Sequence, residues 1–462
     1  MKVLFVSVSY TNFYLIDDIV RRLIQHGHEP RLILGMKKKI TIPDDALREI
    51  RSDIPRLVVE PIKRRVFLRH FTKNIREMLN YAHILNYEEI RRWDAAKWGR
   101  NFPAFLWRLV SSPTGKQILK KPDVQKRLRS LEQKIPVDAA IRRQIQRFAP
   151  DLLIAMPLVI PDSADVEYLR AAQSLGIPVL FSIASWDNLL SKGTFHGKPD
   201  FSVVWNESLA VELAGMHGID RDTIFITGAP RFDHLLDGVD ERILPRSEFC
   251  RIAGLDENKD YILYVGSNYL VNSELKKDTD EAVIILEMAD AFANDPHAKD
   301  INILVRPHPT NFGFLEKLRA SGRSNLVIFP ASGEIPDTEE KRMRFHNSIF
   351  HSMAVTGINT TAFVEASALD KPCVTIHTPD FVETQQLPHF HHLTDGEFLE
   401  TANGVGDLVR IVGAIKSGVD TCRDQRCAFV RSFLRPCGKP AVDAYVELVE
   451  DLGIRIKGKG KK

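Results

Sequence analysis

Short apolar runs alternate with helix-like segments along most of this chain, and this alternation is the feature that most restricts its fold. Val3–Val8 is followed by a helical pattern that ends at Gly27, and a second apolar run follows at Arg31–Leu34. A strand, a helix and a strand in this order are typical of a βαβ unit, whose strands are parallel and buried. The alternation therefore predicts an α/β protein with doubly wound, Rossmann-like sheets.

Further apolar runs fall into two series. The first series contains Asp151–Met156, Val179–Ile183, Phe201–Trp205 and Thr223–Thr227. The second series contains Tyr261–Val265, Asn302–Arg306, Asn325–Phe329, Met353–Thr356 and Cys373–Ile376. A chain of 462 residues is too long for one ordinary core. We therefore expect two Rossmann-like domains that face a cleft, residues 1–237 and 247–436, then a terminal helix at 437–454 and a basic tail at 455–462.

The composition is that of a folded protein, with 44% hydrophobic and 27% charged residues. The net charge of +3 gives no argument for a nucleic-acid partner, and we expect none. Five cysteines without a C-x-x-C pair predict reduced thiols, with a metal cluster of Cys422, Cys427 and Cys437 as the alternative. No run approaches 18 apolar residues, so we expect a cytoplasmic protein without a membrane span.

Residues 63–147 differ from the rest of the chain and predict a basic helical insertion in the first domain. They contain 21 Lys and Arg against 7 Asp and Glu, a net charge of +14, which leaves −11 for the remainder of the chain. Aromatic residues are interleaved with these charges: Trp93, Trp98, Phe102, Phe105 and Trp107. This mixture is found on helices at anionic membrane surfaces, while the alternative is a solvated face of helices that pack on their own domain.

The run that ends in Arg306-Pro307-His308-Pro309 is the first candidate site. Arg306 and His308 each precede a proline, which disfavours helical dihedrals, so we expect a stiff stub at a strand end that projects both side chains outward. A guanidinium and an imidazole are well suited to bind phosphate. The alternative is a surface turn with a solvated histidine.

A second stretch, residues 353–376, predicts a strand, a tight turn and a helix. A helix that begins at Thr360 and Thr361 offers backbone N–H groups and two hydroxyls to an anion, and Glu365 follows one turn later as a candidate ribose ligand. The alternative is a capped helix with an exposed Glu365. Ser267 and Asn268, after another predicted strand, can add donors to the same phosphate.

Three aspartates are candidates for a chemical role. Asp187 follows a predicted parallel strand, where ligands lie in open α/β sheets, so it is a candidate general base if its carboxylate stays unpaired and basic; an Asx-turn or a helix cap is the alternative. Asp278 and Asp280 resemble a metal-binding D-x-D pair, but acids in a first helical turn are explained by the helix dipole. We therefore predict neither a metal nor another cofactor.

These motifs carry a resemblance. Residues 226–233, at the end of the first series, resemble the domain junction of Kdo transferases. The Arg306–Pro309 stub and the turn and helix at 357–369 resemble the nucleotide-sugar half of GT-B glycosyltransferases, especially bacterial surface-polysaccharide enzymes, teichoic-acid glycerophosphotransferases and UDP-N-acetylglucosamine 2-epimerase. The resemblance covers residues 150–380. The first loop, 9–12, lacks the histidine base that many of these transferases have.

The resemblance implies roles for the candidate residues and a function. By similarity, Arg306, His308 in its protonated form, Thr360 and Thr361 bind donor phosphate and Glu365 binds the ribose. The implied enzyme is a metal-independent glycosyltransferase of cell-envelope polysaccharide synthesis. It uses a nucleotide-sugar donor and a surface-glycan or lipid-linked acceptor, and its alternative location is the inner face of the cytoplasmic membrane. A CDP-polyol phosphotransferase, a non-hydrolysing UDP-sugar 2-epimerase and an inactive membrane-associated scaffold remain as alternatives.

Overall fold

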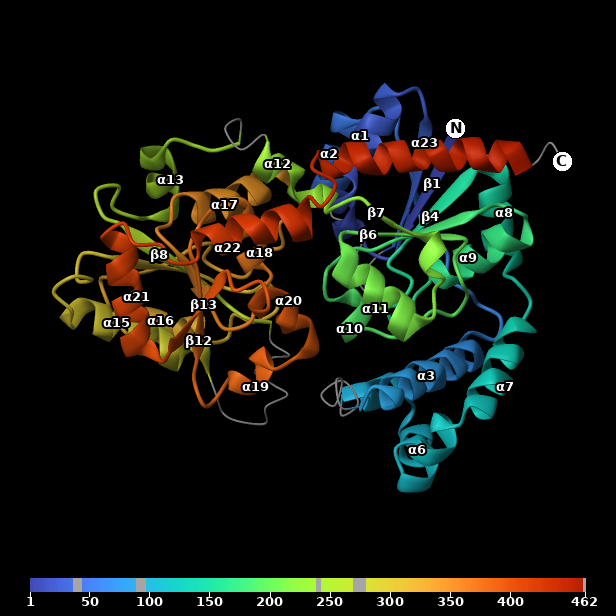
Figure 1. Cartoon of the computed structure of the whole chain (residues 1–462), viewed down its shortest axis with the longest axis horizontal. Coiled ribbons are helices and arrows are strands. Elements are labelled where there is room, and N and C mark those ends of the chain that lie inside the picture. The colour runs from blue at the N-terminus through green and yellow to red at the C-terminus, as the bar shows by residue number, and fades with distance from the viewer. Residues whose placement is uncertain (36–43, 89–96, 238–241, 269–279, 460–462) are drawn as a thin grey trace. The chain divides into compact units, whose positions relative to one another are not determined.

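The computed structural model divides the chain into two compact units (Figure 1). Unit 1 comprises Met1–Arg231 and Phe433–Lys462, and unit 2 comprises Phe232–Ser432. The structure describes residues 1–35, 44–88, 97–237, 242–268 and 280–459. Each unit contains one parallel sheet, of seven and six strands respectively. The predicted α/β class with two Rossmann-like domains is therefore confirmed.

Unit 1 is built on a sheet in the order β3-β2-β1-β4-β5-β6-β7. Its strands are β1 Lys2–Ser7, β2 Glu29–Leu34, β3 Val58–Pro61, β4 Leu152–Met156, β5 Val179–Ser182, β6 Phe201–Val204 and β7 Ile224–Ile226. The helices outside the insertion are α1 Asp17–Gln25, α2 Asp44–Asp53, α8 Ala139–Phe148, α9 Asp165–Ser174, α10 Asn188–Ser191, α11 Glu207–His217 and α23 Ala441–Lys459. Every strand pairs in parallel with its neighbours.

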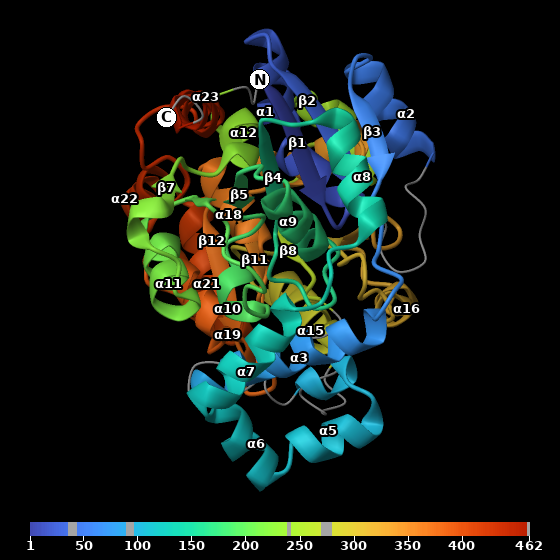
Figure 2. The same ribbon diagram turned by 90° about the vertical axis from the view of Figure 1, so that its right-hand side faces the viewer.

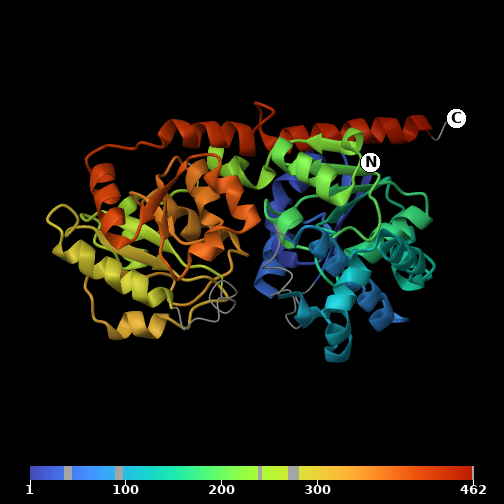
Figure 3. The same ribbon diagram turned by 60° about the horizontal axis from the view of Figure 1, so that its bottom comes forward.

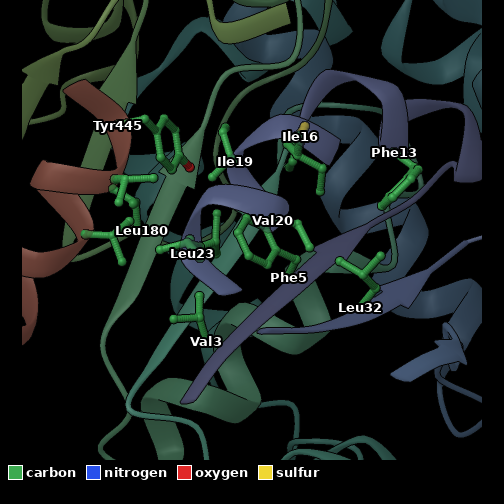
Figure 4. Packing of buried hydrophobic residues seen from close by; sticks show 14 of the residues in the cluster. Val3, Phe5, Phe13, Ile16, Ile19, Val20, Leu23, Leu32, Leu180 and Tyr445 are labelled. Atoms are coloured by element: carbon green, nitrogen blue, oxygen red, sulfur yellow. The ribbon is translucent and has the colours of Figure 1, made fainter. Parts of the chain in front are cut away.

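The core of unit 1 joins the two ends of the chain. Val3 and Phe5 of β1 lie in one buried cluster with α1, and Tyr445 of α23 joins this cluster beside Ile19 and Leu180 (Figure 4). Because side chains alternate along a strand, the equally buried Leu4 and Val6 face the other side of the sheet. Both faces are thus covered, which explains the continuous apolar strands that the sequence shows.

Helix α23 returns the chain to unit 1 and runs along it beside the N-terminus (Figure 3). Its Asp443 pairs with Arg22 at 3.1 Å, and Glu450 contacts His26 and His28 at 3.1 and 3.0 Å. The helix extends to Lys459, so the prediction of a separate basic tail from residue 455 was wrong for 455–459, while 460–462 lie outside the described residues. Ile456 in this basic segment packs against the core of unit 1.

The insertion consists of helices with a small core of their own (Figure 2). Its helices are α3 Arg69–Asn86, α5 Ala104–Val110, α6 Pro113–Lys120 and α7 Pro122–Gln133. Trp98 and Phe102 are buried in that core, and Trp107 stacks on Phe102 with ring centroids 5.8 Å apart. These three aromatic rings therefore stabilise the insertion and do not form a surface belt, whereas Phe105 is 73% exposed. Trp93 lies outside the described residues.

Unit 2 has a sheet in the order β10-β9-β8-β11-β12-β13, also all parallel. Its strands are β8 Tyr261–Val265, β9 Asn302–Arg306, β10 Leu326–Ile328, β11 Val355–Gly357, β12 Cys373–His377 and β13 Leu399–Asn403. Its helices include α12 Asp233–Leu236, α13 Arg246–Ala253, α15 Glu281–Asn294, α16 Leu315–Ala320, α17 Glu339–Phe350, α18 Ala362–Ala368, α19 Val382–Gln385, α20 His391–Thr394, α21 Val405–Lys416 and α22 Arg423–Phe429.

Boundaries and edge strands differ from the sequence prediction. Unit 2 begins at Phe232, so α12 already belongs to unit 2 and precedes the polar stretch 237–246 that the sequence suggests as the interdomain linker; residues 238–241 lie outside the described residues. The strands β3 and β13 were missed because Val58–Pro61 and Leu399–Asn403 lie at sheet edges and lack a continuous apolar run. None of the described helices is long and apolar enough to cross a membrane.

Candidate functional site

The candidate site lies at the carboxyl edge of the sheet in unit 2. The chain order of its strands reverses between β8 and β11, which are paired to each other. Loops 266–268 and 358–361 follow these two strands, and the stub 307–311 follows β9, the other neighbour of β8. Ligands of doubly wound sheets bind at such a reversal. All predicted donor-binding residues in these loops are thus brought to one edge.

Two glycines allow this close approach. A Cβ atom on Gly357 would meet the carbonyl oxygen of Val265 at 2.7 Å, and one on Gly333 would meet the carbonyl oxygen of His308 at 2.6 Å. Any side chain at these positions would push the backbones apart. The two glycines therefore set the spacing of β8 from β11 and of the stub from the loop that covers it.

The stub is fixed by hydrogen bonds that the sequence did not reveal. Asn311 is 7% exposed, and its Nδ2 donates to the carbonyl of Ser267 at 3.1 Å and to Oε1 of Glu281 at 3.2 Å. Thr310 Oγ1 donates to Oδ1 of Asn268 at 3.2 Å. The stub and loop 266–268 are consequently one structure, held from the side by polar groups.

His308 is oriented through its Nδ1 atom. The backbone N–H of Thr310 donates to Nδ1 at 3.1 Å, and Thr310 Oγ1 lies 2.9 Å from the same atom. Both contacts involve Nδ1, so Nε2 is the ring nitrogen that can face a phosphate oxygen. The protonated form of His308 stays a prediction. The ring can still donate one hydrogen bond from Nε2 to a phosphate oxygen.

Arg306 does not project outward. It is 5% exposed, its guanidinium lies 3.5 Å from Oε2 of Glu334 and its centre is 4.9 Å from the ring centroid of Phe345. Burial lowers the pKa of Arg306 to about 10, although Glu334 opposes this shift. The loop that carries Glu334 folds over the strand end, which the proline rule alone could not predict. Arg306 thus supplies positive charge from behind the stub.

Ser267 contributes a hydroxyl, while its backbone N–H is already used. That N–H donates to both carboxylate oxygens of Glu281 at 3.1 Å, so it is not available to a phosphate in this arrangement. The side chain of Ser267 is 1% exposed, and its Oγ has no hydrogen-bond partner within the part of the chain that the structure describes. A buried hydroxyl without a partner is unusual and is compatible with a ligand contact.

Glu281 is the residue that the sequence analysis missed most clearly. It is the first residue of α15, is fully buried and also accepts from the Tyr264 hydroxyl at 2.9 Å. With Ser267 and Asn311, three different groups donate to this one carboxylate. Its position at a helix start, just after a strand and a polar loop, was the only available signal.

The second loop leads into a short helix. Thr360 and Thr361 are half-buried, and Oγ1 of Thr360 accepts from the N–H of Ala362 at 3.3 Å, which leaves the hydroxyl proton of Thr360 for a ligand. Gln385 ties this loop to the sheet through the carbonyl of Ile358, at 3.2 Å. Helix α18 is only seven residues long. The dipole of this short helix therefore contributes little to anion binding.

Glu365, the predicted ribose ligand, lies inside α18 and is 4% exposed. This excludes the exposed glutamate that we kept as the alternative. Its role as a ribose ligand stays a prediction.

Asp187 in unit 1 does not meet the condition set for a base. Its Oδ2 accepts from Oγ of Ser191 at 2.7 Å and lies 3.4 Å from Nζ of Lys192. A carboxylate that is paired with a lysine holds a proton less readily than an isolated one. The local alternative of a turn or cap is closer to what is seen, since Asp187 immediately precedes α10.

The described residues considered as metal ligands have other roles or stand as free thiols. Asp280 caps α15 by accepting from the N–H of Ala282 at 2.9 Å, while Asp278 lies outside the described residues. Cys422, Cys427 and Cys437 are free thiols. Among the residues that the structure describes, no three His, Cys, Asp or Glu are grouped so that they could hold a metal ion.

Comparison with known proteins identifies the fold. No protein-family model matches the sequence, and no curated protein matches it. Among solved structures, UDP-GlcNAc 2-epimerase from Neisseria meningitidis, bound to UDP-GlcNAc, has 13% identity and a TM-score of 0.55, with 98% of this chain and 100% of that chain covered. A glycosyltransferase from Rickettsia africae has 12% identity and a TM-score of 0.52, with 98% of both chains covered.

A variant of the wall teichoic acid polymerase TagF gives a similar match, with 11% identity, a TM-score of 0.52 and coverage of 100% of this chain and 90% of that chain. These proteins all have the GT-B fold. At such low identities the likeness defines the fold alone. The chain is therefore a GT-B protein, and the predicted resemblance is confirmed at that level.

Proposed function

We propose that this protein is a metal-independent glycosyltransferase that moves a sugar from a nucleotide-sugar donor to a surface-glycan or lipid-linked acceptor. The observation that carries the proposal is the convergence of loops 266–268, 307–311 and 358–361 at the β8–β11 reversal of unit 2. The solved structure from Neisseria meningitidis has the same fold and holds UDP-GlcNAc, which supports a nucleotide-sugar as the ligand class.

In the proposed complex, hydrogen-bond donors of the three loops bind the donor phosphates. The Nε2–H of His308 and the hydroxyls of Ser267, Thr360 and Thr361 face the phosphates, with Asn268 beside His308. Arg306 adds positive charge from behind, and Glu365 accepts hydrogen bonds from the ribose. As the bond between the sugar and the phosphate breaks, negative charge develops on the leaving nucleotide, and these groups stabilise it.

The acceptor hydroxyl must lose a proton as its oxygen bonds to the sugar. We assign no base for this step, because the sequence candidate Asp187 is held by Lys192 and Ser191. In this proposal the catalytic power comes from stabilisation of the leaving group. Activity in excess EDTA should therefore equal activity in buffer, and a loss that added Mg²⁺ restores would contradict the metal-independent part.

A thermal-shift panel of UDP, CDP, CMP and GDP tests the ligand class. We expect UDP or another nucleoside diphosphate to raise the melting temperature of the wild-type protein. The same nucleotide should raise the melting temperature of His308→Ala by less. The exposed His297 in the same unit provides a matched control, since His297→Ala removes an imidazole away from the three loops. No shift with any nucleotide would favour an inactive scaffold.

Two related reactions remain candidates because proteins of both kinds share the fold. A non-hydrolysing epimerase needs only one substrate, so C2 inversion of a UDP-sugar incubated with the protein alone would identify it. A CDP-polyol phosphotransferase would respond to CDP and not to UDP. Sugar transfer that requires both a nucleotide-sugar and an acceptor would establish the glycosyltransferase.

A further inference from the structure

We infer that unit 1 contains a phosphate-binding pocket for an amphiphilic acceptor, a lipid-like molecule with a phosphate head. The assignment to the acceptor rests on the proposed function, whereas the pocket itself does not. The pocket is open to solvent and lies between the segment before α3, the first two turns of α3 and the loop after β4. The basic residues that line it are Arg64, Arg65, Arg69, Lys73 and Arg76.

Two of these cations are neutralised inside the protein. Arg65 lies 2.8 Å from Glu167, and Arg76 lies 2.6 Å from Glu132 and 2.8 Å from Glu167. All four side chains are at most 7% exposed. Each buried cation thus has an acidic partner at hydrogen-bond distance, and this inner pair of arginines forms the floor of the pocket.

The other three cations are less fully paired. Arg64 and Arg69 share Oδ2 of Asp162, at 3.6 and 3.4 Å, and both are more than one third exposed. Within the described residues Lys73 makes no ion pair, although the carboxylate of Glu77 attracts it. Because two arginines share one carboxylate, a phosphate can make charge-assisted contacts to them that Asp162 alone does not satisfy.

A hydroxyl without a partner points to a ligand at the same place. Thr72 lines the pocket and is 2% exposed, yet its Oγ1 has no hydrogen-bond partner within the part of the chain that the structure describes. A threonine on a helix commonly donates back to a carbonyl four residues earlier. The buried Oγ1 of Thr72 does not, and it can donate to a phosphate oxygen held by Arg69 and Lys73.

The position of the pocket in unit 1 also favours a substrate site. Its wall of residues 162–164 belongs to the loop after β4, and the strand order of unit 1 reverses between β1 and β4. Substrates of doubly wound sheets bind at this kind of reversal. Asp162 is held there by its N–H, which donates to Oε1 of Glu77 at 3.1 Å.

Apolar side chains border the basic pocket in the sequence segment that enters α3. Val66 is 87% exposed, Phe67 67% and Phe71 46%, and they alternate with the pocket residues Arg64, Arg69 and Thr72 along the chain. Large exposed apolar side chains beside a cationic pocket suit a ligand whose anionic head is joined to an apolar chain. An amphiphilic phosphate has both an anionic head and an apolar chain, whereas a free phosphate ester has only the anionic head.

Binding of octyl phosphate, inorganic phosphate and uncharged octyl glucoside to the full chain, measured by calorimetry, tests the inference. We expect octyl phosphate to bind at least about tenfold more tightly than inorganic phosphate. Arg69→Gln/Lys73→Gln should weaken octyl phosphate binding by about tenfold or more. The control Lys126→Gln/Arg127→Gln removes two exposed charges from α7 of the same insertion and should bind like wild type.

Equal binding of octyl phosphate by wild type and by Arg69→Gln/Lys73→Gln would overturn the pocket. Binding of octyl glucoside as tight as that of octyl phosphate would also overturn it, because the phosphate would then be irrelevant. If inorganic phosphate bound as tightly as octyl phosphate, the proposed contact with an apolar chain would be overturned. The ligand would then be a free phosphate ester. Binding to vesicles with phosphatidylglycerol but not to octyl phosphate would identify a membrane surface instead of an acceptor site.

Nucleotide binding separates this inference from the proposed function. Arg69→Gln/Lys73→Gln should keep the thermal shift that a nucleoside diphosphate produces, since the variant changes unit 1 and the donor loops lie in unit 2. Octyl phosphate binding without any nucleotide response would leave the pocket standing and remove the glycosyltransferase. A nucleotide response without octyl phosphate binding would remove the pocket and leave the glycosyltransferase standing.

Discussion

The two sheets share the same order of their first strands, but different segments lie at their carboxyl edges. In both units the first three strands lie in the order 3-2-1, and the fourth pairs with the first. In unit 2 the edge carries short loops joined by hydrogen bonds around Glu281. In unit 1 a long basic insertion separates β3 from β4, and buried ion pairs around Arg76 connect it to the domain.

The two edges differ in the side chains that are proposed to contact a phosphate. In the proposed complex of unit 2, His308 and Ser267 donate hydrogen bonds to a phosphate, and Arg306 is buried behind them. In the proposed pocket of unit 1, Arg69 and Lys73 can pair with a phosphate directly. Preorganised donors stabilise charge that develops during a reaction, and charge-assisted contacts bind a charge that a ligand already carries.

The largest expected effect is on the ion pairs of unit 1. Arg76→Leu leaves Glu132 and Glu167 buried without their shared partner, which should destabilise unit 1 by about 3–5 kcal/mol. All five tryptophans lie before residue 206, so tryptophan fluorescence follows the unfolding of unit 1 alone. Arg127→Leu, at an exposed position, is the control, and equal urea midpoints for the two variants would contradict the role of the ion pairs.

Acid should weaken unit 1 by a comparable amount. Burial by itself would raise the pKa of Glu132, but its contacts with His196 and Arg76 lower it to about 2. The folded-state pKa is below the unfolded value, so Glu132 stabilises unit 1 above pH 4.5, and this contribution, about 3 kcal/mol, is lost as the pH falls from 4.5 to 2.

Urea unfolding followed by tryptophan fluorescence at several pH values measures this loss. Glu132→Gln cannot titrate at this position, so its stability should change less between pH 4.5 and pH 2 than that of wild type. Parallel curves for the two proteins over this interval would show that Glu132 does not carry the acid sensitivity.

In unit 2, His308→Ala should lower turnover by about two orders of magnitude while the protein stays folded. The reason is the loss of the Nε2–H donor to the leaving phosphate, which acts most strongly in the transition state. Turnover is measured with the nucleotide-sugar that the thermal-shift panel selects. Near-normal turnover would remove His308 from the proposed mechanism, and His297→Ala controls for the loss of an imidazole elsewhere.

The smallest effect is expected for Glu281→Gln. An amide cannot accept from Tyr264, Ser267 and Asn311 as a carboxylate does, so loop 266–268 should lose its fixed position and the Kd for the nucleotide should rise about tenfold. Glu287→Gln, on the exposed side of the same helix, is the control. Equal Kd values would show that the carboxylate does not position the loop.

The sequence was sufficient for the fold class because both sheets are parallel and buried on both faces. Continuous apolar runs such as Tyr261–Val265 and Asn302–Arg306 were placed at the bounds that the structure has. Edge strands such as Val58–Pro61 escaped because only their central residues are partly buried. The convergence of the three loops in unit 2 was also predictable, since strand ends and parallel order determine it.

What the sequence by itself determined is thus the α/β class, the two sheets, the basic insertion and the residues that reach the edge of unit 2. Only the tertiary structure decided how these residues are used: Arg306 lies under the loop of Glu334, His308 accepts at Nδ1, and Asp187 is paired with Lys192. Strand patterns depend on local alternation of apolar residues, which a sequence displays. Burial, tautomer and ion pairing depend on partners far away in the chain, which only folding brings into contact.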